Sequence, residues 1–431
     1  VSVVLTASAP TAGVLIAARL FDGIQGAATG AASMALVLQV FSHGDRVKAM
    51  GWWALVGAGG PVLGVTIGAP IIQYFGWRAL FWGELPLMAV AAVLAVIVLP
   101  SGDRSVGMAG PVGATDPARD TSAAGGPATA AGSSAGDGDG STEPAGPWWV
   151  QLDWLGSLTL STSVTACLLA LNVGPSWGFA APPTLVVFAV SVLSGVAFVV
   201  HERRAPHPLI PLRYFRMRNF VFPLGARTFV NFSYMGGFFL FPILVERVYG
   251  YSETRAGLVS TARPLMFSIV APIAGYAAVK VGERLSTVAG AVALLLSMLL
   301  FTQLGAQPSL VVILVALAMS GVGNGLSTPA TAASASNEVA PDELGVMSAA
   351  QQLITQIGIV AGIQVMVTVQ ASAHGGVGSL ASFHRAYAVG AVGAVLAGAF
   401  GLFMRNTPGH GRKPAVAGAD IAGSRPVDQA E

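Results

Sequence analysis

The sequence has one cysteine and few charged residues, and both shortages exclude whole classes of protein. Cys167 alone can form neither a disulfide within the chain nor a metal site built from cysteines. Only 10% of the 431 residues are charged, whereas soluble proteins have roughly a quarter. A chain that is 54% hydrophobic cannot cover its surface with 20 acids and 22 Lys or Arg residues, which excludes a soluble protein of several domains.

Motifs for ligand-binding chemistry are also missing. The six histidines are scattered without the spacing of metal ligands, and there is neither a P-loop nor a constellation of Ser, His and Asp. We therefore predict no metal site and no cofactor, and we do not expect an enzyme or an ATP-driven pump. The net charge of +2 indicates no particular partner, and we predict no nucleic-acid binding.

Long apolar runs dominate the rest of the chain. A run of 18 or more apolar residues is typical of a helix that crosses the membrane. Eleven such spans are predicted, and residues 1–8 look like the end of one more helix. The eleven spans are approximately 13–41, 49–73, 79–100, 154–173, 182–200, 220–245, 256–279, 286–304, 309–335, 345–371 and 386–404. The predicted fold class is all-α, a polytopic helical membrane protein.

Two segments interrupt this pattern. Residues 101–150 consist largely of Gly, Ala, Ser, Pro, Thr and Asp, which cannot bury enough apolar surface to offset the entropy lost on ordering. We predict a disordered linker there and a loose polar tail at 405–431. The segment 205–219 contains several cations and has amphipathic character, so we expect it to lie along the membrane surface.

The distribution of Lys and Arg predicts the orientation. Alternating the eleven spans places fifteen cations on one side, including those of 201–219, and four on the other: Arg78, Arg247, Arg255 and Arg385. The positive-inside rule assigns the richer side to the cytoplasm. We therefore expect the linker and the C-terminus to be cytoplasmic, in a multi-pass protein of the cell membrane.

Six segments, in order, resemble landmarks of the major facilitator superfamily. The first is LIAARLFDGIQGAA (15–28), which resembles that superfamily's fourth-helix signature. The second is GAGGPVLG (57–64), which is similar to its fifth-helix antiporter motif through Gly57, Gly60, Pro61 and Gly64. The others resemble the fourteen-helix drug:proton antiporter branch and lie at 75–87, 152–160, 207–220 and 248–258.

The resemblance implies an organisation in two helical bundles. Residues 1–100 would be the remnant of the N-terminal bundle, 151–204 two extra central helices, and 220–404 a six-helix C-terminal bundle. A fourteen-helix member would begin three helices earlier, so we expect Val1 to start a truncated product. Asp22 stands where the family usually has a neutral polar residue, and Glu84 stands where the branch commonly has Asn.

Ionisable residues inside membrane spans are functional candidates because their insertion is unfavourable. Arg19 and Asp22 share a helix face at i, i+3, and form either a structural ion pair or a titratable acid beside an arginine on the transport pathway. Arg227 either snorkels to the cytoplasmic face or faces the pathway. Arg263 precedes Pro264, so it marks a helix kink or a substrate contact. Together with Glu84, these residues form the predicted proton and substrate pathway.

Three other features have a plainer structural explanation. Glycines spaced by four residues, such as Gly321/Gly325 and Gly358/Gly362, are typical of tight helix packing. Asp153 is expected to cap a helix N-terminus. A group of large apolar residues could line a cavity for apolar substrates or simply pack between helices: Tyr234, Met235, Phe238, Phe239 and Phe241.

The resemblance implies a secondary active transporter that exports hydrophobic or amphipathic small molecules such as drugs, with protons as the coupling ion. One alternative is an importer or exporter of one specific metabolite on the same fold. Another is a truncated, non-transporting membrane fragment. Drug-efflux assays would separate an exporter from an importer, and the coding sequence upstream of Val1 would separate a transporter from a fragment.

Overall fold

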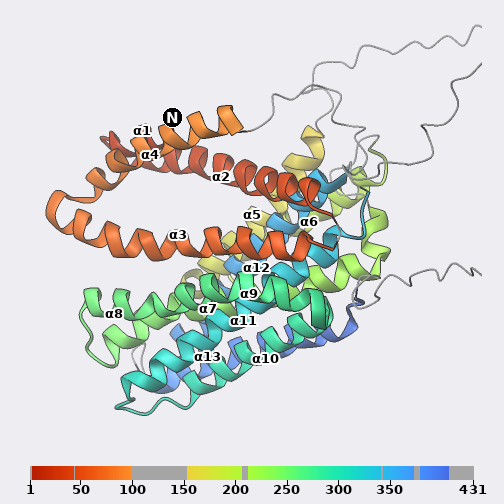
Figure 1. Cartoon of the computed structure of the whole chain (residues 1–431). Coiled ribbons are helices and arrows are strands. Elements are labelled where there is room, and N and C mark those ends of the chain that lie inside the picture. Colours follow the sequence, from red (N-terminus) through yellow and green to blue (C-terminus); the bar gives the residue numbers. More distant parts are fainter. Residues whose placement is uncertain are drawn as a thin grey trace, which may run out of the picture. The chain divides into compact units, whose positions relative to one another are not determined.

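The computed structural model describes residues 2–42, 44–98, 153–205, 212–340, 343–372 and 379–406. Helices make up its regular structure, and these residues contain no strand. The helices are α1 (Ser2–Ala7), α2 (Ala12–Val40), α3 (Arg46–Phe75), α4 (Trp77–Val98), α5 (Trp154–Trp177), α6 (Pro182–Glu202), η3 (Leu212–Arg216), α7 (Arg218–Arg247), α8 (Glu253–Ser260), α9 (Ala262–Val281), α10 (Glu283–Thr302), α11 (Leu310–Ser336), α12 (Leu344–Ala371) and α13 (Leu380–Phe403) (Figure 1).

A helix covers each of the eleven predicted spans. By length and composition, ten helical segments of the described residues can cross a membrane, and the joined pair α8–α9 counts as one of them. The 30-residue helix α3 is not among the ten, so the span 49–73 stays a prediction. The predicted linker and most of the predicted tail lie outside the described residues.

The chain divides into two compact units. The first contains residues 1–30, 67–214 and 341–346, and the second contains residues 31–66, 215–340 and 347–431. In the first unit, α5 packs on α6 through two reciprocal hydrogen bonds: each hydroxyl of Ser163 and Ser191 donates to the other residue's carbonyl oxygen, over 2.9 Å. The helix α1 contacts α4 in the same unit.

The second unit is a helical bundle with a continuous apolar core. Its helices α7, α9, α10, α11 and α13 run beside one another (Figure 1). Small residues bring helices close, since packing rather than the hydrophobic effect drives their association in a membrane. A Cβ on Gly323 would lie 2.7 Å from the carbonyl oxygen of Gly290, so α10 and α11 nearly touch there. The core residues include Phe241, Leu294, Phe301, Leu317 and Tyr387.

The predicted close packing at two pairs of glycines is confirmed. A Cβ on Gly321 would meet the backbone of α9, and one on Gly325 would lie 3.0 Å from Val270 of the same helix. On α12, Gly358 and Gly362 lie directly against the backbone of α7. At Gly321, Gly358 and Gly362 the neighbouring backbone leaves no room for a side chain, whereas at Gly325 the side chain of Val270 would have to shift slightly.

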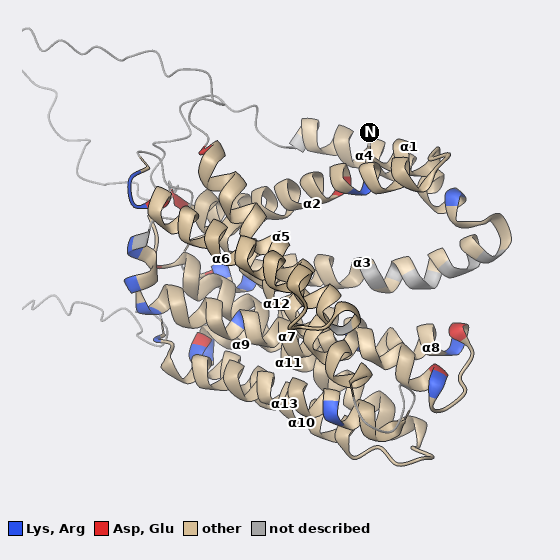
Figure 2. Cartoon of the chain, turned by 180° about the vertical axis from the view of Figure 1, so that it is seen from behind, with Lys and Arg blue, Asp and Glu red and all other residues tan. Residues whose placement is uncertain are grey.

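Charged residues lie mainly near helix ends, and long stretches between them carry no charge (Figure 2). Within the second unit, loops predicted for the cation-rich side do lie together. The backbone N–H of Arg405 donates to Asn219 at the start of α7, over 2.9 Å. The N–H of Arg284 donates to Asn406 over 3.0 Å. These contacts place the starts of α7 and α10 beside the end of α13, as the alternation of spans requires.

Candidate transport site

Arg19 and Asp22 form the ion pair that their spacing predicts. One guanidinium nitrogen of Arg19 lies 2.8 Å from a carboxylate oxygen of Asp22, one turn along α2. The other oxygen of Asp22 accepts a hydrogen bond from the Ser2 hydroxyl over 3.1 Å. Phe81 of α4 lies beside the guanidinium, with its ring centroid 4.8 Å away. The two side chains are 44% and 33% exposed within their unit, so this pair is not enclosed by its neighbours.

Glu84 and the predicted antiporter glycines have few neighbours. Glu84 is exposed on α4. Among the described atoms, none lies within 4 Å of a Cβ built on Gly57, Gly60 or Gly64. The roles predicted for these residues and for Pro61 therefore stay predictions.

Arg227 does not snorkel. The side chain is only 4% exposed and is held between three helices of the second unit. Its Nε donates to the hydroxyl of Thr355 on α12 over 2.5 Å, and one terminal nitrogen lies 3.5 Å from the carbonyl oxygen of Thr328 on α11. Both partners are neutral, so Arg227 is a buried cation with hydrogen bonds but without a carboxylate partner among the described residues.

Arg263 is more completely enclosed. Arg263 is the second residue of α9, and the single residue Thr261 separates α9 from α8. The helix interruption predicted near Arg263–Pro264 is therefore present. The side chain has no exposed surface. One terminal nitrogen donates to the carbonyl oxygen of Tyr234 on α7 over 2.9 Å. The guanidinium carbon also lies 5.5 Å from the ring centroid of Tyr234 and 5.9 Å from that of Phe238.

The aromatic residues predicted to line a cavity divide between two roles. Tyr234 and Phe241 are buried in the core of the second unit, where Phe241 packs edge-on against Phe301. Phe239 is 51% exposed on the outside of α7. The interhelical packing explanation therefore holds for Phe241, whereas Tyr234 and Phe238 border Arg263.

A groove lies on the surface of the second unit. Its volume is about 810 Å³, and it is mostly apolar. Residues of α2, of the turn that follows it, of α3 and of α9 line it: Ser33, Val37, Phe41, Asp45, Lys48, Ala49, Trp52, Trp53, Val56, Gly57 and Tyr276. At one end Lys48 lies 2.7 Å from Asp45, and this hydrogen bond holds the pKa of the Asp45 carboxyl below its usual value.

Arg46 is a buried arginine that the sequence analysis missed. Its Nε donates to the carbonyl oxygen of Leu38 at the end of α2 over 3.0 Å. One terminal nitrogen donates to the carbonyl oxygen of Ser336 and to the side chain of Asn337, over 3.2 and 3.1 Å. Arg46 thus ties the turn after α2 to the end of α11. Arg46 and Ser336 are 290 positions apart, so no local sequence pattern could have predicted this contact.

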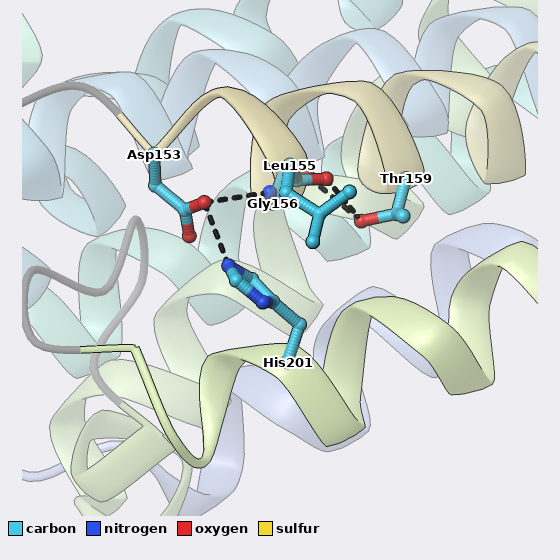
Figure 3. Close-up of polar contacts among 5 residues, drawn as sticks. All are labelled: Asp153, Leu155, Gly156, Thr159 and His201. Atoms are coloured by element: carbon cyan, nitrogen blue, oxygen red, sulfur yellow. Dashed lines mark hydrogen bonds and ion pairs between the residues drawn. The ribbon is translucent and has the colours of Figure 1, made fainter. Parts of the chain in front are cut away.

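The predicted N-cap of α5 is confirmed, and it has a second partner. Asp153 accepts a hydrogen bond from the backbone N–H of Gly156 over 2.7 Å (Figure 3). The same carboxylate oxygen lies 2.8 Å from Nε2 of His201 near the end of α6. The side chain of Asp153 is only 7% exposed. The pair joins two helices whose residues are 48 positions apart, so the sequence alone suggested only the cap.

Buried cations surrounded by neutral groups can attract an anion or shape a pathway for ions. Arg227 of α7 and Arg263 of α9, which contacts α7, belong to the second unit. Arg19, Asp22 and Glu84 belong to the first. Among the described residues, no group of three His, Cys, Asp or Glu side chains is arranged to hold a metal ion.

Comparison with known proteins identifies the class. The family model of the Major Facilitator Superfamily matches residues 1–363 and, in a second overlapping match, residues 229–427. The chain belongs to this superfamily and is a multi-pass membrane protein. The resemblance drawn from the six motifs is thus confirmed for the superfamily, while the number of helices in the whole protein stays a prediction.

Individual relatives are similar at a modest level. The chain is 24% identical to the Multidrug resistance protein Stp of Mycobacterium tuberculosis over 367 residues, which cover 84% of this chain and 60% of that protein. It is 23% identical to the Multidrug transporter protein MdtP of Bacillus subtilis, covering 80% and 57%. It is 25% identical to the Methylenomycin A resistance protein of Streptomyces coelicolor, covering 90% and 74%. The chain therefore spans about three fifths of the length of the first two relatives.

Proposed function

We propose that the protein is a secondary active transporter that exports hydrophobic or amphipathic small molecules across the cell membrane in exchange for protons. The observation that carries this proposal is the pair of buried arginines, Arg227 and Arg263, inside the helical bundle of a superfamily member. Ionisable groups inside a membrane bundle are costly to insert, so by default they indicate a substrate or ion pathway. The relatives named for multidrug resistance support export of drugs.

In such folds two bundles rock about a central site while a membrane acid gains and loses a proton. Asp22 is our proposed acid in this chain, with Arg19 as the residue that holds it in place. The double change removes both charges at once, so neither is left unpaired within the predicted span. Replacing both residues should therefore leave the protein folded.

The experiment measures proton-driven efflux of a fluorescent amphipathic dye by the full chain in membrane vesicles. Vesicles that contain the wild type should accumulate the dye when a proton gradient is imposed and release it when the gradient is collapsed. The double variant Arg19→Gln/Asp22→Asn should be inserted normally but show no gradient-dependent transport. The variant Arg255→Gln, which changes an exposed arginine of α8, is the matched control.

Each outcome has a separate meaning. Full gradient-driven transport by a well-expressed double variant would remove the pair from the mechanism while leaving the transporter proposal intact. No gradient-driven movement of any amphipathic dye by the wild type would contradict proton-coupled export itself.

A further inference from the structure

Two guanidinium nitrogens of Arg263 have no partner in the part of the chain that the structure describes. One terminal nitrogen, Nη1, donates to the carbonyl oxygen of Tyr234. The other two nitrogens, Nε and Nη2, are buried and have no hydrogen-bond partner among the described residues. These two N–H groups share one edge of the guanidinium, and that edge is the one that receives both oxygens of a carboxylate in a bidentate pair.

The charge of Arg263 also has no counter-ion in the part of the chain that the structure describes. The ion pairs found there involve other cations: Arg19, Lys48, His201 and Arg213. Aromatic faces around Arg263 attract the cation but do not neutralise it. A buried guanidinium without an anion is unfavourable. A carboxylate is the group that would both neutralise this cation and accept from its Nε–H and Nη2–H groups.

The walls of the site are aromatic. Tyr234 and Phe238 of α7 face the guanidinium, and the Phe301 ring of α10 lies 5.9 Å from its central carbon. The Tyr387 ring of α13 stacks on Phe301, with 4.5 Å between centroids. Three rings from two helices thus lie within 6 Å of the cation, and Tyr387 extends this aromatic wall behind Phe301. Flat apolar bodies pack well against such faces.

Two features allow this site to change. A Cβ on Gly237 would lie 3.4 Å from both terminal nitrogens of Arg263 and 3.0 Å from Met298, so a side chain at this position would contact the guanidinium. The joint between α8 and α9 at Thr261 lies two residues before Arg263. Interrupted helices of this kind are typical of transporter binding sites. The guanidinium is fully enclosed here, so a ligand would enter when α9 moves relative to α7.

We infer that Arg263 anchors the carboxylate of an amphipathic substrate with an aromatic body, through its free Nε and Nη2 edge. This inference names the substrate class and rests on the proposed transport function. Neutral and cationic compounds with the same body should bind more weakly, because they leave the guanidinium without a counter-ion.

The test compares three fluorescent probes that share a dansyl ring: dansylglycine, which has a carboxylate; its uncharged amide; and the cation dansylcadaverine. Binding is measured to the full chain in lipid nanodiscs, with the signal of empty nanodiscs subtracted. The wild type should bind the carboxylate at least tenfold more tightly than the amide or the cation. Equal affinity for all three probes would overturn the inference without any variant.

Variants then locate the effect. Arg263→Gln should weaken binding of the carboxylate at least tenfold and change binding of the amide less than twofold. Arg263→Lys keeps the charge but loses the bidentate edge, so its affinity for the carboxylate probe should lie between those of the wild type and Arg263→Gln. The matched control is Arg255→Gln, because Arg255 of α8 lies on the surface, where its guanidinium stacks on the Tyr251 ring. A folded Arg263→Gln protein that keeps the carboxylate preference would overturn the inference.

The outcomes separate this inference from the proposed function. If Arg263→Gln fails to fold, the wild-type probe series and Arg263→Lys still decide. Carboxylate binding that depends on Arg263, without gradient-driven efflux, would contradict only the transporter proposal. Efflux of neutral or cationic dyes by a wild type with no carboxylate preference would contradict only the role of Arg263.

Discussion

Arg227 of α7 and Arg263 of α9 are both buried, but their surroundings differ. Arg227 uses neutral oxygens of Thr355 and Thr328, and each of these partners has a further hydrogen bond. The Thr355 hydroxyl donates to the carbonyl oxygen of Gln351 over 2.7 Å. The Thr328 carbonyl oxygen also accepts from Thr331 over 3.2 Å. Removing Arg227 therefore leaves both partners with a hydrogen bond. In contrast, Arg263 itself has two nitrogens without a hydrogen-bond partner among the described residues.

Arg227→Met should leave the protein about as stable as the wild type, within about 1 kcal/mol, since replacing a buried charge with an apolar group of similar volume is often neutral. If Arg227 borders the transport pathway, gradient-driven dye efflux should fall at least tenfold in the same protein. Thermal unfolding in detergent and efflux in vesicles measure the two effects. Arg247→Gln, at the exposed end of α7, serves as the control. A loss of more than about 3 kcal/mol with efflux preserved would make Arg227 purely structural.

At the scale of helices, glycine determines how closely α12 can approach α7. A Cβ on Gly358 would meet the backbone of Thr228, and one on Gly362 would meet the backbone of Phe232. Backbone cannot move aside as a flexible side chain can. The close contact between α12 and α7 therefore requires glycine at both positions.

Gly362→Ala should destabilise the protein by about 1–3 kcal/mol, the usual range for overpacking. Gly345→Ala in the same helix is the matched control, because no neighbour lies within 4 Å of a Cβ there. Alanine is the better helix former by about 1 kcal/mol, so this control should be neutral or slightly stabilising. The midpoint of thermal unfolding checks both, and equal midpoints for the two variants would contradict the close packing of α12 on α7.

The carboxylate of Asp153 both caps α5 and holds the end of α6. Asp153→Ala should cost about 0.5–2 kcal/mol for the lost cap, and more if the contact with His201 contributes. Ser309→Ala, which removes the N-cap of α11, provides a control without a histidine partner.

Hydrogen exchange at 154–160 and 198–202 should separate the two roles. Asp153→Ala should speed exchange in both segments, whereas His201→Gln should speed it only in the second. Unchanged exchange at the end of α6 in both variants would show that the pair does not hold the two helices together.

For the whole molecule, the distribution of cations predicts the orientation. Fifteen cations fall on one side of the predicted spans and four on the other. Reporter fusions at Gly125 and Gly423 should both give a cytoplasmic signal, because the positive-inside rule retains the richer side there. A fusion at Ala306, between α10 and α11, should report the opposite side. A signal from the outer side at Gly125 or Gly423 would contradict the proposed orientation.

The sequence by itself determined the class of fold, because the length of an apolar run and the spacing of small residues are local properties. It predicted the membrane helices, the pair Arg19–Asp22, the cap at Asp153, the interruption near Arg263 and the close packing at Gly358 and Gly362. Each of these depends on residues close together in the chain.

Only the tertiary structure decided which buried groups meet. It turned Arg227 inward between Thr355 and Thr328, tied Arg46 to Ser336 across 290 positions and paired Asp153 with His201. It also enclosed Arg263 among aromatic rings and left two of its nitrogens without a hydrogen-bond partner among the described residues. These contacts join separate helices, and their partners depend on how the helices pack, which no local pattern of residues specifies.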